Sequence, residues 1–184
     1  LAFSALIELD KATAEVVSCE FVKSVIHSRA ALSYHEAQLM ISSDDRDPLA
    51  QSIRTLALLA RKLRAKRMEA GALTLASPQV RFELCNESDS PTDVGSYTLF
   101  EANSTVEEFM LLANVCVARR ILQDRPAILR HHPPPPQKNF DSLNLKLEYL
   151  QKPLLDVSSS KTLAESLDRV GKDLDQLVRI AATR

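Results

Sequence analysis

Two adjacent carboxylates and an amide interrupt the apolar run between Asn103 and Ile121. Glu107 and Asn114 are two helical turns apart, which places them on one stripe of a helix together with Leu111. The rest of the run is apolar almost all the way round, a pattern typical of a mostly buried helix. A buried polar group without a partner costs about 1–3 kcal/mol. The stripe therefore needs either partners within the fold or a polar ligand.

A capping box offers a structural role for the first carboxylate. The sequence STVE at 104–107 has the spacing of this motif. Ser104 would cap the helix, and the Glu107 carboxylate would accept a hydrogen bond from the Ser104 backbone N–H. Glu108 would face solvent near the start of the helix, where negative charge is favoured. Neither role accounts for Asn114, so a binding function for the stripe stays open.

A second stretch that could bind a ligand is the positively charged segment RKLRAKR at 61–67. On a helix its cations cannot all face one side. They either complement the dipole at the C-terminal end of a helix or contact the phosphates of a ligand. The cations are Arg61, Lys62, Arg64, Lys66 and Arg67.

The other reactive side chains give weaker indications. Tyr34 is typical of a half-buried packing residue with a hydrogen-bonded hydroxyl. The four histidines are not spaced as metal ligands, and three glycines are too few for a phosphate-binding loop. Cys19, Cys85 and Cys116 show no CxxC spacing, which argues against a zinc site or a disulfide framework and indicates a reducing compartment. We expect Cys19 and Cys116 to be small buried apolar residues.

Length and composition are those of one ordinary domain. The 184 residues are 45% hydrophobic and 26% charged, which is average for a globular protein. A net charge of −1 gives no strong global field, so any nucleic-acid contact would use a local basic patch. No apolar run approaches the roughly 20 residues of a membrane span, so we expect no membrane-spanning role.

The elements that position these residues follow from periodicity and from cap and turn signals. Residues 3–9 alternate as a half-buried strand, and the polar turn at 10–15 joins them to a second strand in an antiparallel hairpin. Ser33 and Glu36 form a capping box. The expected strands lie at 3–9, 16–26, 72–76, 79–85 and 97–102, and residues 85–96 are expected to be a solvated loop.

The expected helices lie at about 34–41, from Pro48 to Gly71, at about 104–123, near 140–150 and at 161–183, the last either as one helix or as two that break at Gly171. Four prolines at 133–136 would hold a connector in the polyproline II conformation. Strands come mostly early and in the middle and helices mainly later, which predicts the α+β class. The chain opens on Leu1 without a methionine and ends in a helix without a stop signal, as a piece of a longer polypeptide would.

Four segments together carry a resemblance to a known family. KSVIHSRAALSYHEAQLMI, EAGALTLASP, NSTVEEFMLLAN and LRHHPPPP resemble, in order and spacing, the ribonuclease II (RNB) family. The resemblance covers essentially the whole chain and points to the eukaryotic branch that supplies the catalytic 3′→5′ exoribonuclease subunit of the RNA exosome. It implies that residues 1–184 are the central portion of one RNB catalytic domain, with the metal-binding aspartates before this portion and an active-site arginine after it.

The resemblance also implies an activity. The intact enzyme would be a processive hydrolase that releases nucleoside 5′-monophosphates from the 3′ end of single-stranded RNA. An aspartate cluster would hold its Mg²⁺ and stabilise charge on the attacking and leaving oxygens. Its partners would be single-stranded RNA and the exosome core subunits, in the nucleus and nucleolus and also in the cytoplasm. This portion alone would bind no metal and be inactive.

Three positions match family residues that hold RNA. Tyr34 matches a tyrosine near the 3′-terminal nucleotides, and Glu107 matches a carboxylate that contacts ribose, whose 2′-hydroxyl distinguishes RNA from DNA. Leu75 stands where bacterial relatives have a phenylalanine that stacks on the terminal base; leucine offers apolar contact only. Further channel or supporting residues, expected from local chemistry, are Glu108, Asn114 and Arg130.

Two other functions are compatible with the sequence. One is a catalytically inactive RNA-binding or scaffold domain of the same fold, which would lack the aspartates of the metal site. The other is an interaction module that uses HHPPPP as a polyproline ligand, although a rigid connector explains these prolines better.

Overall fold

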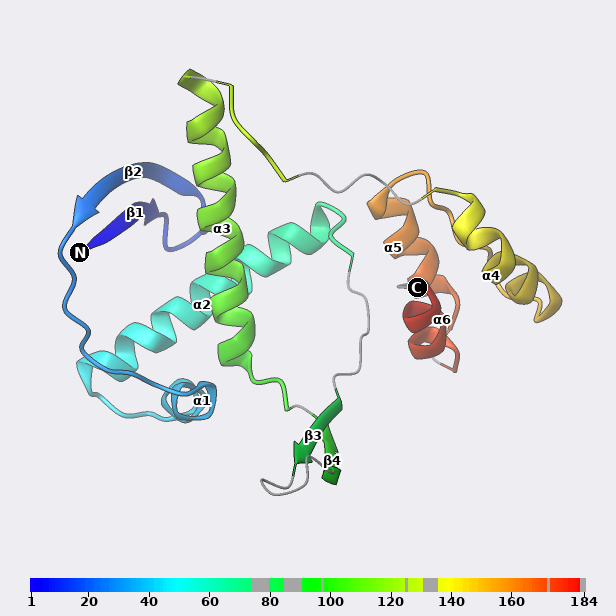
Figure 1. Ribbon diagram of the computed structural model, residues 1–184, viewed down its shortest axis with the longest axis horizontal. Coiled ribbons are helices and arrows are strands. Elements are labelled where there is room, and N and C mark those ends of the chain that lie inside the picture. Colours follow the sequence, from blue (N-terminus) through cyan, green and yellow to red (C-terminus); the bar gives the residue numbers. More distant parts are fainter. Residues whose placement is uncertain are drawn as a thin grey trace. The chain divides into compact units, whose positions relative to one another are not determined.

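The computed structural model describes residues 1–73, 80–84, 91–96, 98–124, 126–130, 136–171 and 173–182 (Figure 1). The chain forms two compact units. The first consists of Leu1–Lys66 and Leu99–Arg130, and the second consists of Arg67–Thr98 and His131–Arg184. Within the described residues, no helix combines the length and the apolar character needed to cross a bilayer.

The first unit opens with the predicted hairpin. Strand β1 (Ala2–Leu9) pairs antiparallel with β2 (Val16–Ser24). The turn between them is closed by the side chain of Asp10, whose Oδ1 accepts a 2.6 Å hydrogen bond from the Thr13 backbone N–H. Ala14 has a positive φ of 57° just before the second strand. The prediction of an antiparallel hairpin is confirmed.

Helix α1 (Tyr34–Ser42) has the predicted capping box. The Ser33 hydroxyl accepts from the Glu36 N–H, and the Glu36 carboxylate accepts a 2.7 Å bond from the Ser33 N–H. Its C-terminal end is held by Arg54 of the next helix, which donates to the carbonyls of Met40, Ser43 and Asp45. The side chain thus supplies a donor to the Met40 carbonyl in the last turn, which a helix end leaves unpaired, and also binds the C-cap and the loop that follows.

Helix α2 (Pro48–Glu69) begins at the predicted proline and is followed by Gly71 at φ +93°. It crosses α3 (Glu101–Asp124), the longest helix of the first unit (Figure 1). The buried residues on α2 are all small: Ala50, Ala57 and Ala60. Small side chains let neighbouring backbones approach closely, which suits a helix crossing.

The second unit contains β3 (Val80–Leu84) and β4 (Pro91–Ser96), which pair antiparallel. The expected solvated loop over 85–96 is wrong where β4 lies, and residues 85–90 are outside the described residues. The strand expected at 97–102 is also wrong, because residues 98–100 are outside any strand and α3 begins at Glu101. Of the strand expected at 72–76, residues 72 and 73 are not in a strand and the rest is not described.

Three short helices complete the second unit: α4 (Lys138–Tyr149), α5 (Ser160–Arg169) and α6 (Asp175–Ala182). Gly171, at φ +99°, separates the last two, so of the two alternatives for 161–183 the one with a break is confirmed. The apolar faces of the three helices and the link between α4 and α5 form one core, which consists of Phe140, Leu147, Leu155, Val157, Leu163, Leu167, Val170 and Val178. Of the proline run, residues 133–135 lie outside the described residues. The order of the elements confirms the α+β class.

Candidate functional site

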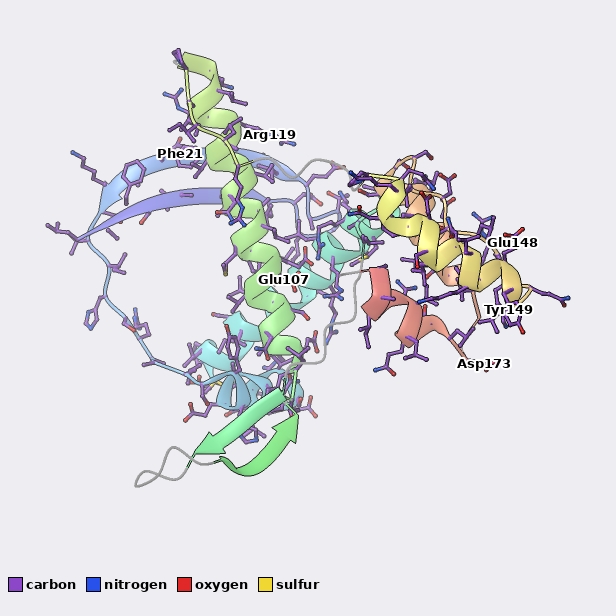
Figure 2. All side chains as sticks on the ribbon, turned by 45° about the vertical axis from the view of Figure 1, so that its right-hand side comes forward. Phe21, Glu107, Arg119, Glu148, Tyr149 and Asp173 are labelled. Carbon is purple, nitrogen blue, oxygen red and sulfur yellow. The ribbon has the colours of Figure 1, made fainter. Side chains whose placement is uncertain are left out.

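The predicted polar stripe lies on an exposed face of α3. Glu107, Leu111 and Asn114 are all exposed, and they follow one another along one face of the helix. Figure 2 shows Glu107 on the N-terminal half of α3 and Arg119 nearer the C-terminal end. The stripe therefore lines a surface that a ligand of the first unit can reach.

The rest of α3 is less buried than its composition suggests. Met110 is 60% exposed and Leu122 is 56% exposed, and several other large apolar side chains of the helix are also exposed. The expectation of a mostly buried helix is therefore wrong for the described residues. Within the first unit, α1, α2 and the hairpin cover only part of the circumference of α3.

The predicted capping box at 104–107 is also wrong, because α3 starts three residues earlier. The N–H of Phe100 donates to Oδ1 of Asn103 over 3.0 Å, so Asn103 takes the part that Glu107 was expected to play. Ser104 lies inside the helix and accepts a hydrogen bond from Arg64. Glu107 is about two turns beyond the cap residue Phe100, and the structural role proposed for it there does not apply.

Glu108 has the opposite environment from its neighbour. It is 3% exposed, whereas the expectation was a solvent-facing carboxylate. It lines a cavity of about 380 Å³ between α2 and the first turns of α3. The polar residues around it are Arg61, Arg64, Glu101, Ser104 and Thr105. Glu108 is thus buried on the side of α3 that faces α2.

The basic segment of α2 is engaged within the first unit. Arg61 forms a two-bond ion pair with Glu101, in which Nη2 donates to Oε2 over 2.8 Å. Lys62 Nζ donates to the carbonyls of Lys11 and Ala12 in the hairpin turn, at 2.8 Å each. These contacts join α2 to α3 and to the hairpin, a role that neither sequence-based alternative included.

The ion pair has an electrostatic consequence. The Arg61 guanidinium, hydrogen-bonded to Glu101, lowers the pKa of that carboxyl below its ordinary value. The same contact raises the pKa of Arg61. Glu101 is the first residue of α3, where a negative charge also complements the helix dipole. The start of α3 is thus fixed to α2 by a paired charge.

Helix α1 brings Tyr34 to the same unit. Tyr34 is the first residue of α1 and is 42% exposed. The helix packs on the start of α3, where Gln38 Oε1 accepts from the Ala102 N–H over 3.2 Å and His35 meets the Phe100 ring edge-on. Tyr34 and the stripe are therefore carried by two helices in direct contact.

The remaining predicted residues lie apart from this arrangement or outside it. Arg130 is exposed in the coil that follows α3. Leu75 lies outside the described residues. In the described part of the chain, no group of three or more histidines, cysteines, aspartates or glutamates could hold a metal ion. The described residues therefore do not fit a Mg²⁺ site.

Comparison with known proteins identifies the family. The whole chain, residues 1–184, matches the RNB domain. The chain belongs to the RNB domain family. It is 47% identical over 190 residues to the exosome complex exonuclease RRP44 homolog A of Arabidopsis thaliana, and 44% identical over 191 residues to the human exosome complex exonuclease RRP44. Both alignments cover 100% of this chain but only 20% of the relative, so this RNB chain spans about a fifth of their length.

Solved structures show the same fold. The apo form of Mycoplasma genitalium RNase R matches this RNB chain with a TM-score of 0.82 at 20% identity, over 97% of this chain and 29% of RNase R. The same enzyme in complex with ribose-methylated single-stranded RNA also gives a TM-score of 0.82, at 19% identity, over 98% of this chain and 29% of RNase R. The resemblance stated from the sequence motifs is confirmed.

Proposed function

We propose that the whole protein is a Mg²⁺-dependent hydrolytic exoribonuclease that degrades single-stranded RNA processively from the 3′ end. Its membership in the RNB family supports this, as do relatives named as exosome complex exonucleases. The proposal extends to exosome-type RNA processing and decay, with exosome core subunits as partners and a nuclear and nucleolar location. The Mg²⁺ ligands would come from outside residues 1–184.

Within that enzyme, this RNB chain would supply side chains that hold the RNA. The observation that carries this role is the exposed stripe of α3, because Glu107 and Asn114 are exposed while Glu108 is buried. An ionised carboxylate only accepts hydrogen bonds and has about four acceptor positions. A ribose 2′-hydroxyl is a donor that DNA lacks, so Glu107 would favour RNA at one nucleotide.

The other proposed contacts follow the same logic. Tyr34 would lie near the 3′-terminal nucleotides, with its ring available for stacking and its hydroxyl for hydrogen bonding. Leu75 would give apolar contact to the terminal base. Arg130 would pair with a phosphate through its forked guanidinium. Asn114 would extend the polar stripe two turns beyond Glu107, and buried Glu108 would support the helix that carries both.

The test compares RNA and DNA oligonucleotides as substrates of the full-length protein. We expect Glu107→Ala to lower kcat/KM on RNA by roughly 10- to 100-fold, the equivalent of one charged hydrogen bond, and to change kcat/KM on the DNA oligonucleotide little, since DNA lacks the 2′-hydroxyl. Glu107→Gln keeps one acceptor oxygen, so its kcat/KM on RNA should lie between those of the wild type and Glu107→Ala. Melting temperature should change little, since Glu107 is exposed.

Glu165→Gln is the matched control, because Glu165 is an exposed glutamate on α5. It should leave both substrates unaffected. Equal losses on RNA and DNA in Glu107→Ala would contradict the ribose contact. A wild-type protein that binds RNA without degrading it in Mg²⁺ would instead support the inactive scaffold domain.

A further inference from the structure

Asn114 is a polar residue of α3 that the first unit does not use. It is exposed, and the described residues give its side-chain amide no hydrogen-bond partner. Its neighbours along the helix surface are apolar, since Met110 is 60% exposed and Leu111 is 36% exposed. A side-chain amide can both donate and accept hydrogen bonds. The amide of Asn114 is therefore available to a polar ligand on this face of α3.

The opposite side of α3 is turned toward the fold. Successive residues of a helix lie about 100° apart, so Asn114 is within about 20° of Glu107 and Cys116 is about 180° from it. Cys116 is 7% exposed, as expected of a buried apolar cysteine, whereas Cys19 of β2 is only half-buried. Glu107 and Asn114 therefore share the face that points away from the packed side of the helix.

The spacing of the two residues along α3 sets a distance. Seven residues at about 1.5 Å each separate Glu107 and Asn114 by roughly 10 Å along the helix axis. Stacked nucleotides of one strand follow one another at about 3.4 Å. About three stacked nucleotides span the distance, and fewer do so where the strand is stretched. A strand along this face would thus meet Asn114 two or three nucleotides away from Glu107.

Helix α1 gives such a strand its direction. The ring of His35 meets the ring of Phe100 edge-on, and α3 begins directly after Phe100. Tyr34 precedes His35 as the first residue of α1, so it lies toward the N-terminal end of α3. The proposed function places the 3′-terminal nucleotides near Tyr34. The strand would therefore run from there toward the C-terminal end of α3, with Asn114 on the 5′ side of Glu107.

We infer that Asn114 is a specificity-determining residue, which binds the ribose 2′-hydroxyl of the nucleotide two or three positions on the 5′ side of the one at Glu107. This inference rests on the proposed function and adds a second point at which RNA is distinguished from DNA. The amide oxygen accepts from the hydroxyl, or the amide N–H donates to its oxygen. Every nucleotide of RNA carries this hydroxyl, so a processive enzyme can renew the contact at each step on any sequence.

The experiment scans RNA oligonucleotides that carry a single 2′-deoxy nucleotide at each position counted from the 3′ end. Fluorescence anisotropy measures their binding to the full-length protein in EDTA, which prevents Mg²⁺-dependent hydrolysis. We expect two sensitive positions, and at the 5′ one the substitution should weaken binding by roughly 2- to 10-fold, the loss of one hydrogen bond. Asn114→Ala should abolish the effect at the 5′ position alone, and Glu107→Ala should abolish it at the other.

Gln123→Ala is the matched control, because Gln123 is an exposed amide of α3 about 160° round the helix from Glu107. It should bind each oligonucleotide as the wild type does. The inference is overturned if Asn114→Ala leaves both sensitive positions unchanged, or if the position that it abolishes is the one at Glu107 or lies on its 3′ side.

A separate assay of hydrolysis in Mg²⁺ tests the proposed function. A protein that shows both sensitive positions in binding but degrades no RNA would contradict the proposed activity and still support the contact of Asn114. A protein that degrades RNA while Asn114→Ala changes neither position would do the opposite. The two failures are thus distinguishable.

Discussion

Gly71 offers the sharpest test of the packing of the second unit. It ends α2 in a Schellman motif, in which the Gly71 N–H donates to the Met68 carbonyl over 2.9 Å and the Ala72 N–H donates to the Arg67 carbonyl over 3.0 Å. Its φ is +93°, and a Cβ at this position would lie 2.5 Å from Cβ and 2.9 Å from Cα of Lys161. Gly71→Ala therefore adds both backbone strain and a clash.

Gly171 is the matched control, because it shares the first effect but not the second. Its φ is +99°, and the nearest atom to an added Cβ is Nζ of Lys152 at 3.7 Å. That distance is an ordinary contact with the flexible end of a side chain. Gly171→Ala therefore adds left-handed strain in open space.

The two sites separate the energy terms. An alanine in the left-handed backbone conformation destabilises the fold by about 1–2 kcal/mol. Replacing glycine also reduces the conformational entropy of the unfolded chain, which offsets about 0.4–1 kcal/mol of this loss. Gly171→Ala should therefore lower the free energy of unfolding by about 1 kcal/mol. Overpacking against a backbone adds about 1–3 kcal/mol, because the Cα of Lys161 cannot move as a side-chain end can. Gly71→Ala should therefore lose about 2–4 kcal/mol.

Urea denaturation with pulse proteolysis measures both variants, with cleavage in 138–182 followed by mass spectrometry. The expected result is a lower midpoint for both, with the larger shift for Gly71→Ala. Equal shifts would refute the contact between the end of α2 and the start of α5. The clash involves the Cβ of Lys161, so adding Lys161→Gly to Gly71→Ala should reduce the shift of the midpoint. If it does not, the contact between the end of α2 and the start of α5 is also refuted.

Three further predictions concern single contacts. In an NMR pH series, the Glu101 carboxyl should titrate with a pKa below that of the unfolded chain, and Arg61→Ala should raise this folded-state pKa. Because the folded-state pKa is the lower one, the ion pair stabilises the fold fully above the unfolded pKa. This stabilisation is lost as pH falls through the folded-state pKa. Gln151→Gly should stabilise the protein by about 0.5–1 kcal/mol in urea, since Gln151 follows α4 with φ +53°; a loss would show that its side chain matters more than its backbone. Arg54→Ala should speed amide exchange in α1 by roughly tenfold, because three carbonyls lose their donor; unchanged exchange would mean that water replaces it.

Local signals predicted the elements whose ends are decided locally. The alternation at 3–9 predicted a strand correctly, because the strand that pairs with it follows directly after a short turn. The capping box at Ser33 and Glu36 was predictable because both halves of the motif lie within four residues. Gly71 and Gly171 ended or divided helices where a left-handed φ was required.

The start of α3 shows where local signals fail. The spacing of Ser104 and Glu107 matches that of a capping box, yet the helix begins at Glu101. Contacts from α1 select the earlier start, because Gln38 accepts from the Ala102 N–H and His35 packs on Phe100. The spacing of nearby residues predicted only the later start, whereas the contact that favours the earlier one comes from a residue 64 positions away in sequence.

The basic segment of α2 could not be assigned for the same reason. Arg61 pairs with Glu101 and Lys62 binds the turn carbonyl of Lys11, partners 40 and 51 residues away in sequence. Periodicity gives the face of a helix on which a charge lies, but not the element that packs there. A search for acidic residues near predicted helix starts would have found Glu101 as a candidate.

The two adjacent glutamates show how the fold makes one of them available to a ligand. Successive residues of a helix point about 100° apart, so a neighbour that covers Glu108 leaves Glu107 exposed. Here the neighbour is α2, whose Ala57 and Ala60 are 1% and 3% exposed and line the same cavity as Glu108. The ion pair between Arg61 and Glu101 then fixes the rotation of α3 at its first turn. The exposed stripe of α3 is therefore a consequence of how α2 packs, and the residues that orient it lie on a helix that need not touch RNA.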